Sequence, residues 1–129
     1  MATPAKPTKS KVPDALKRTL QEKAVQVIED TLKPKHIKPP PTDNDWNYLT
    51  DIYSKWYRSY FYFCATYACP GPNAISPSFD TKFARMEYVG GEKFNLSYMR
   101  HTGQWWEIYQ DLPMLECIER ILQEPHFVP

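Results

Sequence analysis

Apolar residues recur at every fourth position between residues 13 and 33, with polar residues at most positions between them. The members of this stripe are Leu16, Leu20, Ala24, Ile28 and Leu32. Apolar residues three to four positions apart lie on one face of an α-helix. The pattern therefore predicts a helix over 13–33, and we expect it to end before Pro34 because proline disfavours helical backbone in the residue that precedes it.

The segments on either side of this helix are rich in proline and in polar residues. Residues 1–12 combine Pro, Lys, Ser and Thr, a composition typical of a disordered basic tail. Residues 34–44 begin with PKHIKPPP, which predicts a stiff and extended connector. We therefore expect residues 13–129 to form a single folded domain.

The pattern changes after residue 45, where tyrosine, phenylalanine and tryptophan dominate a stretch without Gly or Pro. This stretch predicts two strands, at about 46–54 and 57–68, or one long bent strand. A helical alternative also exists, because five of its apolar residues fit a 3.6-residue period: Trp46, Leu49, Tyr53, Trp56 and Tyr60. We prefer strands, since aromatic side chains suit a pleated, half-buried surface.

Three further strands are predicted by alternation, at 81–89, 93–99 and 104–110. Gly90 and Gly91 separate the first two strands, and a two-glycine connection favours a tight hairpin. His101, Thr102 and Gly103 close a second hairpin before the last strand. Residues 45–110 are therefore expected to form an antiparallel meander of four or five strands.

A second helix is predicted over 112–123, with Asp111 as its N-cap and apolar residues over more than half of its circumference. Two amphipathic helices and one meander sheet can bury their apolar faces against each other in two layers. The expected fold is therefore α+β, with an N-terminal and a C-terminal helix packed on one face of the sheet.

Composition and charge suggest which kinds of function to consider. Aromatic residues make up 15% of the chain and the net charge is +1. Residues 1–38 carry nine Lys or Arg against four acids, whereas residues 39–129 carry seven against eleven. A lysine-rich N-terminal arm on an aromatic sheet keeps nucleic-acid binding as an alternative function, although the acidic body argues against it.

Cysteine, histidine and carboxylate residues form no pattern that predicts catalysis. The three cysteines, Cys64, Cys69 and Cys117, lack the spacing of a zinc site, and an odd number of thiols favours a cytoplasmic setting. No apolar run is long enough to cross a bilayer, so no membrane partner is expected. Phosphate-binding and hydrolase motifs are also missing from the sequence. We therefore predict no catalytic residues, no metal and no cofactor.

The candidate binding residues come from the two strand hairpins. On a strand, Trp105 and Trp106 must point to opposite faces. We predict that Trp106 enters the core and that Trp105 shares the other face with Tyr109. The second hairpin adds Arg100, which we expect to pair with a strand glutamate, and His101.

The first hairpin adds Trp56 and Arg58 as weaker candidates. Together these six residues predict a non-enzymatic domain that binds a protein or a small ligand through an exposed aromatic sheet face. Besides nucleic-acid binding, a small enzyme or ligand-binding protein with a pocket between the sheet and the helices stays an alternative. The sequence leaves the oligomeric state open.

Overall fold

The computed structural model describes residues 11–40, 42 and 46–129. Five strands form one antiparallel sheet in the order β1-β2-β3-β4-β5, so each strand pairs with the next along the chain. Their bounds are β1 (Tyr48–Tyr57), β2 (Tyr60–Ala68), β3 (Ser78–Gly90), β4 (Lys93–Met99) and β5 (Trp105–Pro113). The predicted α+β fold with a meander sheet is confirmed, and the aromatic stretch forms two strands and no helix.

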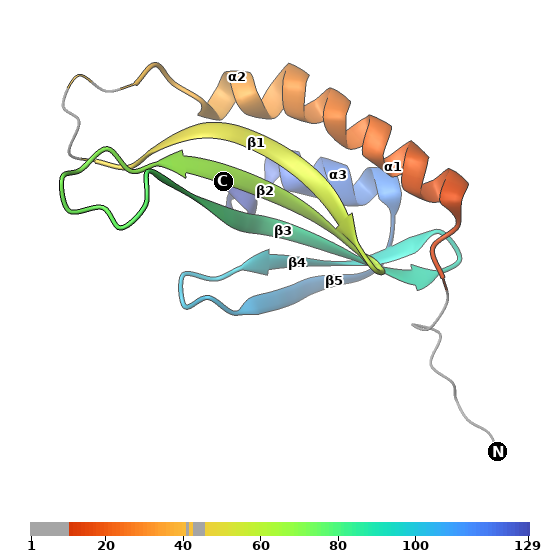
Figure 1. The fold of residues 1–129 in the computed structure, drawn as a ribbon. Coiled ribbons are helices and arrows are strands. Elements are labelled where there is room, and N and C mark those ends of the chain that lie inside the picture. The colour runs from red at the N-terminus through yellow and green to blue at the C-terminus, as the bar shows by residue number, and fades with distance from the viewer. Residues whose placement is uncertain (1–10, 41, 43–45) are drawn as a thin grey trace.

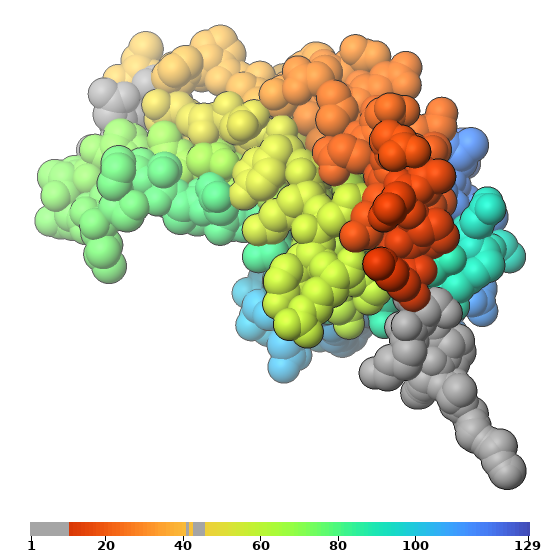
Figure 2. All heavy atoms as spheres, turned by 45° about the vertical axis from the view of Figure 1, so that its right-hand side comes forward, coloured from red at the N-terminus to blue at the C-terminus, as the bar shows by residue number. Residues whose placement is uncertain are grey.

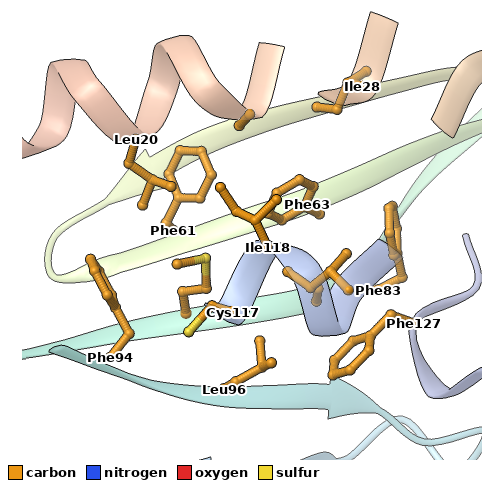
Figure 3. Packing of buried hydrophobic residues seen from close by; sticks show 14 of the residues in the cluster. Leu20, Ile28, Phe61, Phe63, Phe83, Phe94, Leu96, Cys117, Ile118 and Phe127 are labelled. Atoms are coloured by element: carbon orange, nitrogen blue, oxygen red, sulfur yellow. The ribbon is translucent and has the colours of Figure 1, made fainter. Parts of the chain in front are cut away.

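The helices lie on one side of this sheet, and no helix of the described residues lies on the opposite side (Figure 1). Helix α1 (Asp14–Val27) packs on β1, and α3 (Met114–Gln123) packs on β4 and β5. Between them and the sheet lies the core, in which Ile118 of α3 points toward Phe63 of β2 (Figure 3). The side chains of Phe61, Phe63, Phe94 and Leu96 are fully buried there, so the core occupies the space between the two layers.

The predicted stripe of the first helix is confirmed, because Leu20, Ala24, Ile28 and Leu32 are all buried. Each step of four residues overshoots a full α-helical turn by about 40°, so a regular helix would rotate the stripe away from the sheet. A π-helical turn, η2 (Ile28–Leu32), widens the helix at this point. The wider turn takes up the overshoot and keeps Leu32 in the core.

The predicted end of this helix before Pro34 is wrong. Because of the π turn, the N–H of Lys33 donates to the carbonyl of Ile28, five residues earlier. Pro34 then lies in the first turn of a short α-helix, α2 (Lys33–His36), where a missing N–H breaks no helical bond. The connector therefore begins at Ile37, and its residues 41 and 43–45 lie outside the described residues.

Three other boundaries differ from the sequence prediction. Val12, assigned to the tail, is 3% exposed and belongs to the core, whereas residues 1–10 of the predicted tail lie outside the described residues. The sheet extends to Pro113, so α3 begins two residues later than expected. Asp111 is no N-cap, because it lies in β5 with a φ of 56° and Pro113 occupies the cap position. No described helix combines the length and the apolar character that a membrane span requires.

Both tight hairpins contain a residue with positive φ that is not glycine. The β1–β2 turn consists of Arg58 and Ser59, and Arg58 has a φ of 57°. The β3–β4 turn consists of Gly91 and Glu92, both with a φ of 59°, and not of Gly90 and Gly91 as predicted. The shift by one residue follows from an irregularity in the register before Gly90, which places Gly90 opposite Lys93 at the end of the ladder.

Candidate functional site

The side of the sheet that faces away from the helices, here called the open face, is defined by the strand register. One row of paired residues crosses all five strands on this face: Lys55, Tyr62, Arg85, Ser97 and Glu107. Paired residues point to the same side of an antiparallel sheet. The row therefore places two cations, one tyrosine and one glutamate side by side on the face that no helix covers.

Aromatic rings and cations gather around this row. We call the group the ring-and-cation cluster, and its members are Lys55, Tyr57, Tyr60, Tyr62, Lys82, Arg85 and Trp105. The Tyr62 ring lies 6.0 Å from Tyr60 and 5.9 Å from Trp105, centroid to centroid. Lys82 Nζ lies 5.4 Å from the centre of the Tyr62 ring, within the range of a cation–π contact.

Side chains from strands that are not neighbours meet in the cluster. Tyr62 belongs to β2 and Trp105 to β5, so β3 and β4 lie between them. On a flat sheet three strand spacings would separate their backbones by roughly 14 Å. Their ring centres nevertheless lie 5.9 Å apart, so the two side chains reach toward each other across the strands between them, where Ser97 is 1% exposed.

Arg85 occupies the centre of the cluster. Its guanidinium carbon lies 4.9 Å from the ring centre of Tyr60 and 4.9 Å from that of Trp105. Its Nε is buried and has no hydrogen-bond partner among the described residues. A buried N–H without an acceptor costs free energy, so the protein holds a cation between two rings with part of its hydrogen-bonding capacity unused.

A depression in the surface lies at the β1–β2 end of the cluster. Its volume is about 350 Å³, and it is lined by Lys55, Trp56, Tyr57, Tyr62 and Lys82. Figure 2 shows the molecule hollowed between the loop of residues 69–77 (green) and the β1–β2 and β4–β5 turns (yellow-green and light blue). Among the described residues, neither Lys55 nor Lys82 forms a salt bridge. The depression therefore presents two ammonium groups beside tyrosine rings, neither of them paired with a described carboxylate.

Hydrogen bonds hold a carboxylate at the β2–β3 loop end of the open face. Asp80 accepts from the hydroxyl groups of Tyr53, at 2.8 Å, and Thr66, at 2.9 Å. These two bonds lower the pKa of Asp80, and burial together with the bond to Asp80 raises the pKa of Tyr53. The negative charge of Asp80 is thus stabilised by two hydroxyl donors at the edge of the cluster. Cys64 lies beside Tyr53, and burial raises the pKa of its thiol.

The two neighbouring tryptophans point to opposite faces, as predicted, but neither enters the core. Trp105 lies on the open face within the cluster. Trp106 lies on the helix side opposite Tyr98, with 46% of its surface exposed. The prediction that Trp106 is a core residue is wrong. Its ring packs on the edge of Tyr98 and under the Arg100 guanidinium, and Tyr98 in turn packs on the C-terminal 3-10 turn η3 (Pro125–Phe127).

Tyr109 does not share the open face with Trp105, contrary to the sequence prediction. Ser97 pairs with Glu107 and Leu96 pairs with Tyr109, so Ile108 is an extra residue on β5. Such a bulge reverses the alternation of side chains and turns Tyr109 toward α3. Its hydroxyl donates to Glu124 at 2.6 Å, and this bond raises the pKa of Tyr109.

Arg100 and His101 lie in the second hairpin, away from the cluster. The Arg100 guanidinium lies 3.9 Å from the ring centre of Trp106. The expected pairing of Arg100 with a strand glutamate is wrong, because its hairpin places it against this indole, and no described carboxylate lies within salt-bridge distance. His101 is exposed at the turn, so the structure does not bring these two residues together with Trp105.

The two candidates from the first hairpin have different positions. Trp56 is half-buried on the helix side, where its Nε1 donates to the carbonyl of Lys17 at 3.2 Å and its ring packs on Phe61. Arg58 is exposed, with its guanidinium carbon 5.2 Å from the centre of the Tyr57 ring. Trp56 also lines the depression, and Arg58 lies on a ring that borders it, so both stand at the edge of the cluster.

A second depression lies on the opposite side of the molecule, between the first turns of α1 and α3. Its volume is about 510 Å³, and its lining includes Leu16, Lys23, Glu92, Met114 and Leu115. Leu115 is 59% exposed, and the lining is mostly apolar. This groove differs from the open face, because it offers apolar contact without a cluster of cations and rings.

Five members of the cluster were not predicted from the sequence: Lys55, Tyr57, Tyr60, Tyr62 and Lys82. Arg85 was predicted to lie in a strand, without a role. Alternation within β3 could have found Arg85, because it stands between the buried residues Ala84 and Met86 and must therefore point to the open face. Among the described residues, no group of three or more His, Cys, Asp or Glu side chains is arranged to hold a metal ion.

Comparison with known proteins gives a family for this chain. No curated protein matches the sequence, and no solved structure matches it. One family match covers nearly the whole chain, over residues 12–129, and so includes every strand of the sheet and both faces described above. The chain therefore belongs to the family described as Domain of unknown function (DUF3024).

Proposed function

We propose that this protein is a non-enzymatic binding domain that recognises its ligand or partner on the open face of the sheet. The observation that carries the proposal is the Arg85 guanidinium, held between the rings of Tyr60 and Trp105 with a buried and unpartnered Nε. Aromatic residues and arginine dominate binding energy at recognition surfaces. The charge of this guanidinium is paired with no described carboxylate, so an anionic group of a ligand can pair with it.

The depression next to the cluster supports the same proposal. Its volume of about 350 Å³ falls within the range of small-ligand sites, which combine apolar walls with a few polar groups. Here the walls are tyrosine rings and the polar groups are lysines. The three cysteines are free, which is typical of a reducing compartment, so we extend the proposal to a cytoplasmic setting.

The experiment uses 1-anilinonaphthalene-8-sulfonate, a fluorescent probe with flat rings and one sulfonate. We expect Trp105→Ala and Tyr62→Ala to weaken its binding, because both rings lie on the open face. Trp106→Ala is the matched control, since it removes the neighbouring indole on the opposite face. Leu115→Ser is a second control, placed in the groove between α1 and α3.

Probe binding is measured by fluorescence titration, and far-UV circular dichroism checks that each variant is folded. Loss of binding in the two open-face variants, with both controls unchanged, supports the proposal. Binding that survives Trp105→Ala and Tyr62→Ala, or that is lost in Leu115→Ser, would show that the probe uses another surface. Either result would refute the open face as the recognition site.

A further inference from the structure

We propose that the natural occupant of the open face is single-stranded nucleic acid. Bases stack on Tyr62 and Trp105, and phosphates lie near Lys55 and Lys82. This inference rests on the proposed function, because it names the ligand class for the same surface.

The spacing of the rings supports base stacking. The rings of Tyr60 and Tyr62 lie 6.0 Å apart with 30° between their planes, and the rings of Tyr62 and Trp105 lie 5.9 Å apart with 41° between them. Successive bases on one strand are 3.4 Å apart when fully stacked, and a strand that unstacks extends beyond that. The cluster therefore offers neighbouring ring positions at a spacing that an extended strand can follow.

The cations lie where a nucleic-acid backbone would pass. Lys55 and Lys82 both line the depression, and Lys82 Nζ lies 5.4 Å from the centre of the Tyr62 ring. A base on Tyr62 would therefore bring its phosphate within reach of an ammonium group. Basic side chains interleaved with aromatic rings are typical of surfaces that bind single strands without sequence preference.

Three carboxylates share the open face with these cations, those of Asp80, Glu87 and Glu107, and two of them are hydrogen-bonded. Asp80 accepts from Tyr53 and Thr66, and Glu107 accepts from the side-chain amide of Gln110 at 2.7 Å. In contrast, Lys55, Lys82 and Arg85 form no salt bridge among the described residues. The hydrogen-bonded carboxylates keep their negative charge and offset part of the positive field, so the attraction for a phosphate is confined to the immediate surroundings of Lys55, Lys82 and Arg85 beside the rings.

The shape of the face favours a single strand over a duplex. In a duplex the bases are stacked on each other, so their flat faces are hidden from protein rings. The depression of about 350 Å³ suits one splayed nucleotide and is too small to receive a double helix. Stacking of bases on the protein rings therefore favours unpaired strands, whereas attraction between lysines and phosphates alone would not distinguish a single strand from a duplex.

The number of cations predicts a weak dependence of affinity on salt. Single-strand binding falls with a slope of about −0.7 in log K against log salt for each phosphate contact. Contacts from Lys55, Lys82 and Arg85 therefore give a slope of roughly −1.4 to −2.1 for two to three phosphates. Lys82→Gln should reduce the magnitude of this slope by about 0.7.

The experiment measures fluorescence anisotropy of labelled eight-nucleotide oligo(dT) and oligo(U) with the full chain at several salt concentrations. Trp105→Ala should weaken binding roughly 5- to 150-fold, the measured range for loss of one base stack. Trp106→Ala is the matched control and should leave binding unchanged. A variant with Lys6, Lys9 and Lys11 changed to Gln tests the N-terminal arm, and a duplex of the same length tests strand preference.

Binding of the single strands that falls in Trp105→Ala, with the expected slope, supports the inference. Three results would overturn it: no oligonucleotide binding, equal affinity for the duplex, or binding that depends on the three N-terminal lysines and not on Trp105. The naphthalene sulfonate titration separates the two proposals. If that probe still binds at Trp105 while oligonucleotides do not, the ligand class is wrong and the recognition face stands; if neither binds there, both fail.

Discussion

Replacing Arg85 by methionine tests whether the centre of the cluster is kept for binding or for stability. Methionine retains an unbranched stem between the rings of Tyr60 and Trp105 and removes both the charge and the buried Nε. In the native protein the guanidinium carbon lies 4.9 Å from each ring centre, and Nε has no hydrogen-bond partner among the described residues. The substitution therefore removes two favourable contacts and one unfavourable group.

The two effects are of similar size. Each cation–π contact contributes about 0.5–1 kcal/mol, so about 1–2 kcal/mol is lost. An unsatisfied buried polar atom costs about 1–3 kcal/mol, and this cost disappears. We therefore expect Arg85→Met to change the free energy of unfolding by no more than about 2 kcal/mol in either direction. If Arg85 served only the stability of the sheet, its loss from this central, half-buried position would destabilise the protein.

Urea denaturation followed by far-UV circular dichroism measures this change without depending on the fluorescence of Trp105. Arg58→Met is the control, because Arg58 also lies over a ring but is exposed at a turn; its effect should stay within about 0.5 kcal/mol. A loss above roughly 3 kcal/mol in Arg85→Met would refute the reasoning. It would show that Arg85 holds β2, β3 and β5 together and that its position needs no ligand to explain it.

Three other predictions concern the core, a turn and a thiol. Phe63 is fully buried, so Phe63→Ala should destabilise the protein by about 3–5 kcal/mol in urea denaturation. Phe79 is 41% exposed, and Phe79→Ala should destabilise the protein by less than half as much. Equal losses of stability in the two variants would contradict the assignment of Phe63 to the core. Glu92→Asn should stabilise the β3–β4 turn by about 0.5–1 kcal/mol, because asparagine tolerates positive φ better than glutamate, and a lower denaturation midpoint would count against this turn geometry. Burial raises the pKa of the Cys117 thiol from 9.0 to about 12. The contribution of this thiol to stability is therefore complete below pH 9 and is lost as the pH rises toward 12. Cys117→Ala should flatten the fall of the unfolding free energy between pH 9 and 12, and an unchanged slope would show that the thiol does not cause that fall.

Patterns between neighbouring residues were enough to predict the elements and their order. The apolar stripe from Leu16 to Leu32 predicted a helix, and its four innermost members are buried. Short hairpin connections predicted that each strand pairs with the next, which the sheet order confirms. These predictions succeed because helix periodicity, strand alternation and tight turns are set by interactions within a few residues along the chain.

Local patterns failed where distant segments decide the backbone. The helix continues past Pro34 because the π turn at Ile28–Leu32 keeps the stripe on the sheet, a requirement that arises only when helix and sheet are packed. Tyr109 left the open face because an extra residue at Ile108 in the β4–β5 pairing reversed the alternation. A bulge belongs to a pair of strands, and the sequence of one strand alone does not reveal it.

The amino-acid sequence by itself determined the helices, the strands, their order and the opposite directions of Trp105 and Trp106. Only the tertiary structure decided which side chains meet on the open face. Tyr62, Arg85 and Trp105 come from three different strands, and the pairing and register of those strands bring their side chains together. Register between strands depends on the whole sheet, and no single segment of the sequence specifies it.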